Sequence, residues 1–445
     1  MRSYSNARLA ALARDRGLPE AYLRDLLVVS SVLPFKVNEY VADQLIDWSA
    51  APDDPVFRLT FPHRDMLPTD LYASMAALLD SGAPRDVVRK AAAVAQARLN
   101  PHPGGQLDAN VPQLNGRRLD GLQHKYPETV LVFPSQGQTC HAYCGYCFRW
   151  AQFVGSAELR QALGDPADLT DYLATRPGVT DVLFTGGDPL IMRSSVLRRW
   201  VEPLLTPARE DVRTLRFGTK ALSYWPDRFV GDSDADDLLR LLEQCVAADR
   251  HVAVMAHFSH PRELETPLVR RALERLRATG AVVRSQAPLI RHVNDRADIW
   301  ARMWQRQVEL GVVPYYMFVE RDTGARSYFG VPLTDALGIY GDAVRRVSGL
   351  ARSARGPVMS ASPGKVQVDG VTTVAGERVF VLRLLQARDP ALVGRPFFAA
   401  WDPAAEWFDE LRPALGSWFP ETASPQRHPD PPLPHGVRHD HAHRP

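Results

Sequence analysis

The sequence has almost no excess charge and no long hydrophobic run. Its 53 lysines and arginines are matched by 51 aspartates and glutamates, so the formal net charge of the 445 residues is only +2. A charge this small gives no electrostatic reason to expect non-specific binding to nucleic acid or to a membrane surface. The longest apolar stretch, Leu26 to Phe35, contains two serines and a proline and is too short to span a bilayer. The first 17 residues also lack the apolar segment of a secretory signal.

Cysteine and lysine are both scarce, and each scarcity narrows the chemistry. Four cysteines in a chain of this length do not form a disulfide scaffold, and three of them lie within eight residues. That clustering predicts a metal site in a reducing compartment, which points to the cytoplasm. Arginine supplies 48 of the 53 basic residues. Chemistry that requires a primary amine, such as a Schiff base, therefore has five candidates: Lys36, Lys90, Lys125, Lys220 and Lys365.

The apolar pattern of the middle of the chain predicts an α/β fold. Short β-branched runs alternate there with helical stretches, which favours a parallel sheet that is closed or partly closed into a barrel. The six predicted strands lie at 129–133, 181–185, 214–219, 251–258, 281–290 and 312–320.

The pattern also divides the chain into four parts. Residues 1–115 show helical spacing of apolar residues, including a predicted helix over 37–46. Residues 116–330 form the predicted barrel, and residues 331–415 add a helix and strand-like segments. Residues 416–445 are rich in proline and histidine, which predicts a disordered tail.

Cys140, Cys144 and Cys147 form the motif C-x3-C-x2-C shortly after the first predicted strand. Three thiolates this close in the sequence can bind one soft metal centre if the segment loops around it. The remaining cysteine, Cys245, lies almost a hundred residues on in an amphipathic helical stretch, where we expect it to be buried. Three thiolates without a fourth would leave one iron of a [4Fe–4S] cluster open to an outside ligand. The alternative is a structural zinc with His141 as fourth ligand, but the usual paired knuckle ligands are not seen.

The segment CHAYCGYC resembles the cluster motif of radical S-adenosylmethionine (SAM) enzymes, and the order of the later motifs is similar to that of the lysine 2,3-aminomutase family. The resemblance runs from about residue 34 to about residue 385. It implies a partial (β/α)6 barrel, with the helical region before it and a segment carrying a pyridoxal 5′-phosphate (PLP) lysine after it. It also implies that the open iron binds SAM. Gly186, Gly187 and Asp188, in the run TGGDP at the end of the second strand, match the segment that touches the SAM amino group.

Residue-by-residue comparison with this family assigns further positions. Lys365 follows the small residues 362–364 and matches the lysine that binds PLP, for which a flexible loop would let the amine reach the coenzyme. Arg149 matches the arginine that pairs with the substrate α-carboxylate. The other cofactor positions implied by the resemblance are Lys125 and Tyr126 near PLP, Lys220 in the PLP phosphate environment, His257 near SAM, and Gln286 at a cofactor. Each of these is also a common structural polar residue.

One departure from the family bears on the substrate. The lysine enzymes hold the distal ammonium of their substrate with two aspartates, and an ungapped comparison places Arg321 and Val358 at these positions. A buried guanidinium would repel an ammonium and would pair with a carboxylate. The sequence therefore favours a glutamate- or aspartate-type substrate, then a neutral polar amino acid, and lysine third. A one-residue shift in the comparison would instead bring Glu320 or Asp322 to the site.

Together these residues predict a radical SAM, PLP-dependent amino-acid 2,3-aminomutase, which is an isomerase. The expected partners are an amino acid and an electron donor of the flavodoxin or ferredoxin type, with no nucleic acid and no membrane, and the family implies a homo-oligomer. Three alternatives stay open: lysine 2,3-aminomutase proper, a radical SAM and PLP enzyme that performs elimination or dehydrogenation, and a zinc-stabilised scaffold without catalysis. Histidines of the tail are a further possible metal site, although a solvated tail is the simpler interpretation.

Overall fold

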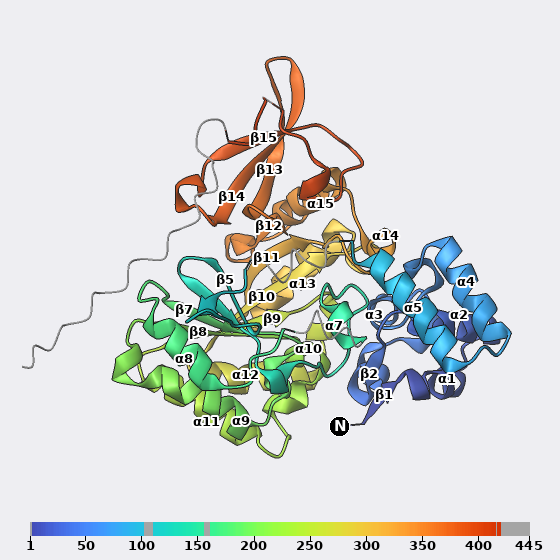
Figure 1. Cartoon of the computed structure of the whole chain (residues 1–445), viewed down its shortest axis with the longest axis horizontal. Coiled ribbons are helices and arrows are strands. Elements are labelled where there is room, and N and C mark those ends of the chain that lie inside the picture. The colour runs from blue at the N-terminus through green and yellow to red at the C-terminus, as the bar shows by residue number, and fades with distance from the viewer. Residues whose placement is uncertain (1, 102–109, 155–160, 415, 420–445) are drawn as a thin grey trace, which may run out of the picture.

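One large sheet forms the centre of the molecule. The computed structural model describes residues 2–101, 110–154, 161–414 and 416–419, and within them eleven strands form this sheet (Figure 1). Their order is β15-β14-β13-β12-β11-β10-β9-β8-β7-β6-β5. The strands are β5 (Leu122–Tyr126), β6 (Thr129–Val132), β7 (Asp181–Phe184), β8 (Thr214–Thr219), β9 (His251–His257), β10 (Val282–Leu289), β11 (Val313–Val319), β12 (Arg355–Ser360), β13 (Gly364–Val374), β14 (Glu377–Ala387) and β15 (Pro396–Ala400).

Strands β6 to β12 run parallel to one another, whereas β5 pairs antiparallel with β6, and β13 to β15 continue antiparallel from β12. The six predicted strands are confirmed as β6 to β11. The sheet curls until β5 contacts β14, the strand next to its other edge. The Lys125 amine of β5 also donates to the Ala361 carbonyl, between β12 and β13. The α/β class and the partial barrel are therefore as expected, with β12 as a further parallel strand.

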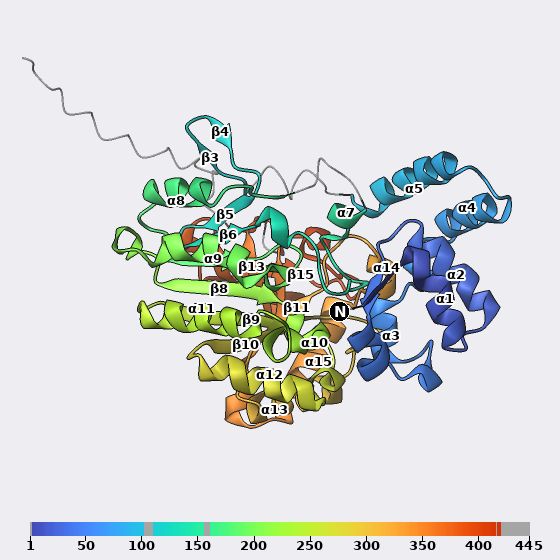
Figure 2. The same cartoon turned by 90° about the horizontal axis from the view of Figure 1, so that it is seen from below.

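Helices connect the parallel strands and pack on the outer face of the sheet (Figure 2). They include α8 (Pro166–Ala174), α9 (Ser194–Val201), α11 (Ala235–Ala247), α12 (Pro267–Ala278), α13 (Ala297–Glu309) and α15 (Leu333–Arg345). Two of these helices begin at capping residues, Asp165 for α8 and Thr266 for α12. Proline occupies the first helical position of each. Cys245 is fully buried on the apolar face of α11, as predicted.

The N-terminal region is mainly helical, with α1 (Asn6–Asp15), α2 (Glu20–Ser30), α3 (Pro55–Thr60), α4 (Thr69–Asp80) and α5 (Arg85–Leu99). The helix predicted over 37–46 is wrong at its first two residues, Val37 and Asn38, whereas the chain is helical from position 39 to position 45. Strand β2 (Lys36–Asn38) pairs there with β1 (Ser3–Ser5), which apolar spacing alone cannot reveal. Only then does one π-helical turn follow, at Val41–Leu45, and the Asn38 side chain accepts the Val41 N–H at its start.

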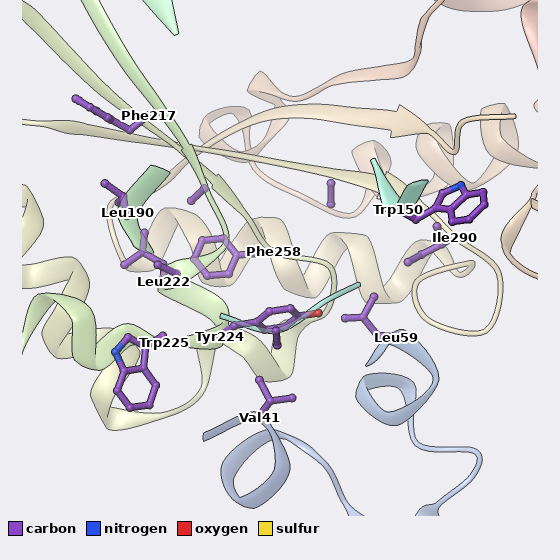
Figure 3. Close-up of a cluster of buried hydrophobic side chains, with 14 of the residues drawn as sticks. Val41, Leu59, Trp150, Leu190, Phe217, Leu222, Tyr224, Trp225, Phe258 and Ile290 are labelled. Atoms are coloured by element: carbon purple, nitrogen blue, oxygen red, sulfur yellow. The ribbon is translucent and has the colours of Figure 1, made fainter. Parts of the chain in front are cut away.

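The N-terminal region and the barrel share one hydrophobic core. Figure 3 shows Val41 and Leu59 of the N-terminal region facing Tyr224 and Ile290 of the barrel, and all four are almost fully buried. The C-terminal strands have a smaller core of their own, which includes Val366, Phe380, Leu382, Phe397 and Trp407.

Two expectations concern membranes and the tail. None of the helices in the described ranges has the length and apolar character needed to cross a bilayer. The Pro- and His-rich tail falls almost wholly outside the described residues, which end at position 419.

Candidate active site

The predicted site residues come together at the carboxyl ends of the parallel strands. The cysteine loop follows β6, the glycine pair follows β7, and Lys220 follows β8. Parallel strands end at one edge of a sheet, so the loops after them meet around a common space. There the structure has a cavity of about 380 Å³. All fourteen predicted residues line it: Lys125, Tyr126, Cys140, Cys144, Cys147, Arg149, Gly186, Gly187, Asp188, Lys220, His257, Gln286, Arg321 and Lys365.

A larger hollow of about 1260 Å³ lies between α2, α5 and the short helix α7 (Trp150–Phe153). None of the predicted residues lines it, so it is not the candidate site.

The N-terminal region holds the cysteine loop in place. The Lys36 amine donates to the carbonyl oxygen of Cys140 at 2.7 Å. The backbone N–H of Tyr143 donates to the Lys36 carbonyl, and that of Gly145 donates to the Leu59 carbonyl, each at 2.8 Å. These bonds join segments about 100 residues apart, and sequence spacing gives no signal for them.

The three thiols of the loop are half-buried and line the same cavity. Burial raises the pKa of each thiol, and for Cys147 it does so to about 12. The nearby thiols add to this, since Cys144 and Cys147 both raise the pKa of Cys140 further. In the described ranges, no three His, Cys, Asp or Glu side chains converge closely enough to hold a single metal ion. A four-iron cluster does not require such convergence, because each thiolate binds a different iron.

His141, the fourth ligand of the zinc alternative, is packed into the protein interior. Its ring lies nearly parallel to that of Trp225, with 6.5 Å between the centroids. Neither ring nitrogen has a hydrogen-bond partner among the described residues, and burial lowers the pKa of His141 to about 3. The missing convergence and this packing both disfavour a structural zinc.

The glycine pair lets the end of β7 pack against the cysteine loop. A Cβ at Gly187 would lie 2.4 Å from the Thr139 carbonyl oxygen, and one at Gly186 would lie 2.3 Å from the Gln138 amide nitrogen. The Asp188 carboxylate accepts from the Thr219 hydroxyl at 2.8 Å. It also accepts the N–H groups of residues 190 and 220, each at 2.9 Å. Asp188 therefore ties the exit of β7 to the exit of β8, and burial raises its pKa to about 6.

His257 and Gln286 are neighbours on adjacent strands. They are directly paired in the register of β9 and β10, and the Gln286 amide donates to His257 Nε2 at 2.8 Å. Burial, together with the nearby ammonium of Lys220, lowers the pKa of His257 to about 3. The imidazole is therefore neutral and can accept this hydrogen bond.

Lys365 lies in a strand, which corrects the expected flexible loop. It is the second residue of β13 and pairs with Ser360 on one side and Gln386 on the other. The preceding Gly364 is required by close approach, since a Cβ there would lie 2.1 Å from the Gln386 carbonyl oxygen. The strand ladder fixes the backbone, so only the side chain of Lys365 is free to move.

The amine of Lys365 lies 4.6 Å from the centre of the Tyr316 ring. Among the described residues it has no hydrogen-bond or ion-pair partner. Burial, aided by the guanidinium groups of Arg216 and Arg355, lowers the pKa of Lys365 to about 7. A large fraction of this amine is therefore neutral, and nucleophilic, near pH 7.

The other two cavity lysines differ in position. Lys125 is close enough to Lys365 to be affected by it: burial, together with Arg388, Arg321 and Lys365, lowers the pKa of Lys125 to about 7. Lys220 lies beside Cys144 instead, where its ammonium pairs with Glu263 at 2.8 Å. Lys220 is therefore less well placed than other cavity residues to bind an anion near Lys365.

Arg216 and Arg355 are the charged residues near Lys365 that sequence reasoning missed. Arg216 forms a two-point ion pair with Asp181, at 2.8 and 2.7 Å. A signal was present, because Arg216 interrupts the apolar strand run TLRFGT. The guanidinium of Arg355 lies over the rings of Tyr315 and Tyr316.

Arg149, Arg321 and Glu320 lie at another part of the cavity wall. Arg149 lies 4.4 Å from the ring centre of Phe133, and burial lowers its pKa to about 10. Arg321 lies over Phe148, and its Nε is buried without a hydrogen-bond partner in the described chain. Glu320 is 6% exposed, and neither carboxylate oxygen has a partner there. Burial, with a smaller effect of Glu406, raises the pKa of Glu320.

Comparison with known proteins decides the family. No protein-family model matches the chain. A protein of Aquifex aeolicus, named as a candidate L-lysine 2,3-aminomutase, is 30% identical over 395 residues. The match covers 88% of this chain and 91% of that protein. The chain belongs to the lysine 2,3-aminomutase family of radical SAM enzymes.

Other members of the family match over shorter lengths. The L-lysine 2,3-aminomutases of Fusobacterium nucleatum and Clostridium subterminale are each 28% identical. These matches cover 52% and 54% of this chain, and 51% and 54% of the two enzymes. Among solved structures, a radical SAM methyltransferase from Sphaerobacter thermophilus is 16% identical, with a TM-score of 0.36 over 79% of this chain and 93% of that protein. The aminomutase names indicate an isomerase, and the family implies a [4Fe–4S] cluster and SAM.

Proposed function

We propose that the chain is a PLP-dependent 2,3-aminomutase that converts an α-amino acid into the corresponding β-amino acid. The observation that carries this proposal is a single cavity of about 380 Å³, lined by three cysteines, a lysine with a pKa near 7, and arginines suited to carboxylates. One shared cavity would let a cluster, SAM, PLP and an amino acid meet in a fixed arrangement.

The donor groups at the cysteine side fit a cluster with SAM. Cys140, Cys144 and Cys147 are soft ligands that line one cavity, and this is the ligand type that iron–sulfur clusters use. The bonded pair His257 and Gln286 lines the same cavity. These two side chains, with the backbone of the glycine pair, would hold SAM.

The groups at the Lys365 side fit PLP. A partly neutral amine can attach the coenzyme, and Lys125 and Arg216, which line the cavity, would supply positive charge for its phosphate. The Phe318 ring lines the cavity with its centre 5.9 Å from the amine, so a flat coenzyme ring would meet an aromatic surface. When bound, the cluster with SAM supplies one-electron removal of a hydrogen atom, and PLP supplies an electron sink for the migrating amine.

Two arginines would orient the substrate. Arg149 would pair with the α-carboxylate and Arg321 with the side chain, which favours glutamate or aspartate. Glu320 is compatible with an acidic side chain because burial raises its pKa, which favours the uncharged form. A neutral amide is the second candidate, since its N–H groups would satisfy the partnerless Glu320 oxygens while Arg321 donates to its carbonyl. Lysine ranks third because Arg321 would repel its ammonium.

The deciding experiment offers a panel of amino acids to the anaerobically reconstituted enzyme with SAM, PLP and a reductant. We expect glutamate or aspartate to yield a β-amino acid of unchanged mass. Turnover of lysine well above both would overturn the substrate assignment. A product that has lost ammonia or hydrogen would instead identify the elimination or dehydrogenation alternative. A colourless, iron-free protein after reconstitution would contradict the proposal as a whole.

We also propose a small electron donor of the flavodoxin or ferredoxin type as partner, because the one-electron reduction needs an outside source. The free thiols of such a site also favour a reducing compartment such as the cytoplasm. Replacing the chemical reductant by reduced flavodoxin should sustain turnover if this partner is correct.

A further inference from the structure

Hydrogen-bond donors gather around one of the three cysteines. The Tyr224 hydroxyl lies 3.4 Å from the sulfur of Cys144. In the part of the chain that the structure describes, no side-chain donor is recorded at the sulfurs of Cys140 or Cys147. The Lys36 amine reaches the backbone carbonyl of Cys140 and not its sulfur. Cys144 is therefore set apart from the other two ligands.

Tyr224 is held rigidly in this position. It is 1% exposed and ends the short helix α10 (Ala221–Tyr224), and its backbone carbonyl accepts the Asn38 side-chain amide at 2.8 Å. Figure 3 shows its ring in the middle of the apolar cluster, near Val41 and Phe258. A cluster-bound sulfur carries no proton, so the phenol must be the donor in this contact.

An ion pair lies behind the phenol, and its Lys220 ammonium acts more strongly on Cys144 than its Glu263 carboxylate, which opposes it. The Lys220 ammonium is 4.5 Å from the centre of the Tyr224 ring and pairs with the fully buried Glu263. The other Glu263 oxygen accepts the N–H groups of Ser259, at 2.5 Å, and of His260, at 3.3 Å. The carboxylate is therefore fixed on both sides, and the ammonium cannot swing away from Cys144.

We infer that Tyr224 and Lys220 act on the cluster ligand Cys144 and raise the reduction potential of the cluster. This inference rests on the proposed cluster. Reduction adds one negative charge to the cluster and its thiolates, and a donor or cation at a ligand sulfur stabilises that charge. The effect is strong in a buried site because the surrounding dielectric constant is low. Tyr224 and Lys220 are thus positioning residues that make the cluster easier to reduce.

The test is the midpoint potential of the reconstituted cluster in the absence of SAM. Electron paramagnetic resonance monitors the fraction of reduced cluster. Tyr224→Phe keeps the ring and removes the hydroxyl. We expect a lower potential, so that at the wild-type midpoint the reduced-to-oxidised ratio falls about threefold or more; tenfold would correspond to about 59 mV. The matched control is Tyr143→Phe in the cysteine loop itself, whose hydroxyl lies 3.3 Å from the Thr139 hydroxyl and not on a sulfur.

A second pair of variants keeps the inference testable if Tyr224→Phe takes up no cluster. Lys220→Gln should lower the potential, and Lys220→Arg should restore most of the loss because it returns the charge. Unchanged potentials in Tyr224→Phe and Lys220→Gln, at wild-type iron content, would overturn the inference. An equal shift in Tyr143→Phe would do so too, because any lost hydroxyl would then suffice. Failure of the wild type to bind iron would instead refute the proposed function.

Discussion

Two half-buried lysines line different parts of one cavity, and they differ in the charged groups that surround their amines. Lys220, beside Cys144, has a carboxylate at 2.8 Å in Glu263. Lys365 lies near two guanidinium groups, and the nearby Asp181 carboxylate already pairs with Arg216. Burial of an ammonium is tolerated when an anion compensates it and shifts the pKa when none does. Lys220 is therefore suited to be a fixed charge, and Lys365 to be a nucleophile.

The two parts of the cavity are also built differently. The cysteine loop depends on distant segments, since Lys36 and Leu59 bond to it from the N-terminal region. Lys365 depends on a local ladder, because β13 and β14 are joined by a tight turn at residues 375–376. The cysteine and lysine sites should therefore fail independently when single side chains are changed, and this is the comparison that the first two predictions test.

The largest effect is expected at the cysteines. Replacing Cys140, Cys144 or Cys147 by alanine removes one of three ligands from the cluster, so iron content and turnover should fall to background. PLP attachment, measured by its visible absorbance, should persist because the Lys365 ladder is untouched. The control is Cys245→Ala in α11, which should keep full iron content. Loss of PLP attachment in all three variants would show that the two sites are not independent.

The converse variant is Lys365→Ala. It removes the amine that we assign to coenzyme attachment, so the visible absorbance of bound PLP and turnover should both disappear. Iron and sulfide content should match the wild type. Lys90→Ala, on the exposed face of α5, is the matched control and should change neither signal. Persistent PLP absorbance in Lys365→Ala would assign attachment to another lysine, with Lys125 as the first to examine.

Much of the fold was predictable because its signals are local. Runs such as TVLVF and HVAVMAHF are nearly continuous apolar segments. Such segments are typical of strands that are buried on both faces of a sheet. The short strand β2 was missed because its pairing with β1 is set by a partner more than 30 residues away. Strand β12 was missed because Gly356 and Pro357 break its apolar pattern.

The membership of the cavity was predictable, whereas its internal arrangement was not. The fourteen residues line one cavity because the strand ends of a parallel sheet converge, and the order of the motifs indicated that many of them follow such strand ends. That order could not place Lys220 beside the cysteines, since the position depends on the ion pair with Glu263, 43 residues away. It also could not show that Glu320 and Arg321, consecutive in sequence, both line the cavity. Their consecutive entry follows from the end of β11 at Val319, after which strand alternation no longer applies.

An effect of intermediate size is expected at Arg321, which we propose contacts the substrate. If it pairs with a side-chain carboxylate, Arg321→Ala leaves that carboxylate buried and unpaired. We expect kcat/KM for the acidic substrate to fall about 100-fold, which corresponds to about 2.7 kcal/mol. Arg321→Asp should reverse the preference toward lysine, and Arg326→Ala, which removes a partly exposed guanidinium paired with Glu406 and Glu410, serves as the control. An unchanged ranking of amino acids in both Arg321 variants would remove this residue from substrate recognition.

The smallest effect concerns the pH dependence of PLP attachment to Lys365. Because the pKa of Lys365 is lowered to about 7, the neutral fraction of its amine should increase about tenfold per pH unit below 7 and level off above it. The rate of PLP attachment should follow this curve. Arg355→Gln removes a positive neighbour, so the pKa of Lys365 should rise and attachment near pH 7 should slow by severalfold. Comparing the variant with the wild type at each pH cancels the ionisation of PLP itself. A wild-type rate that still climbs tenfold per unit between pH 8 and 10 would mean that Lys365 is an ordinary charged lysine.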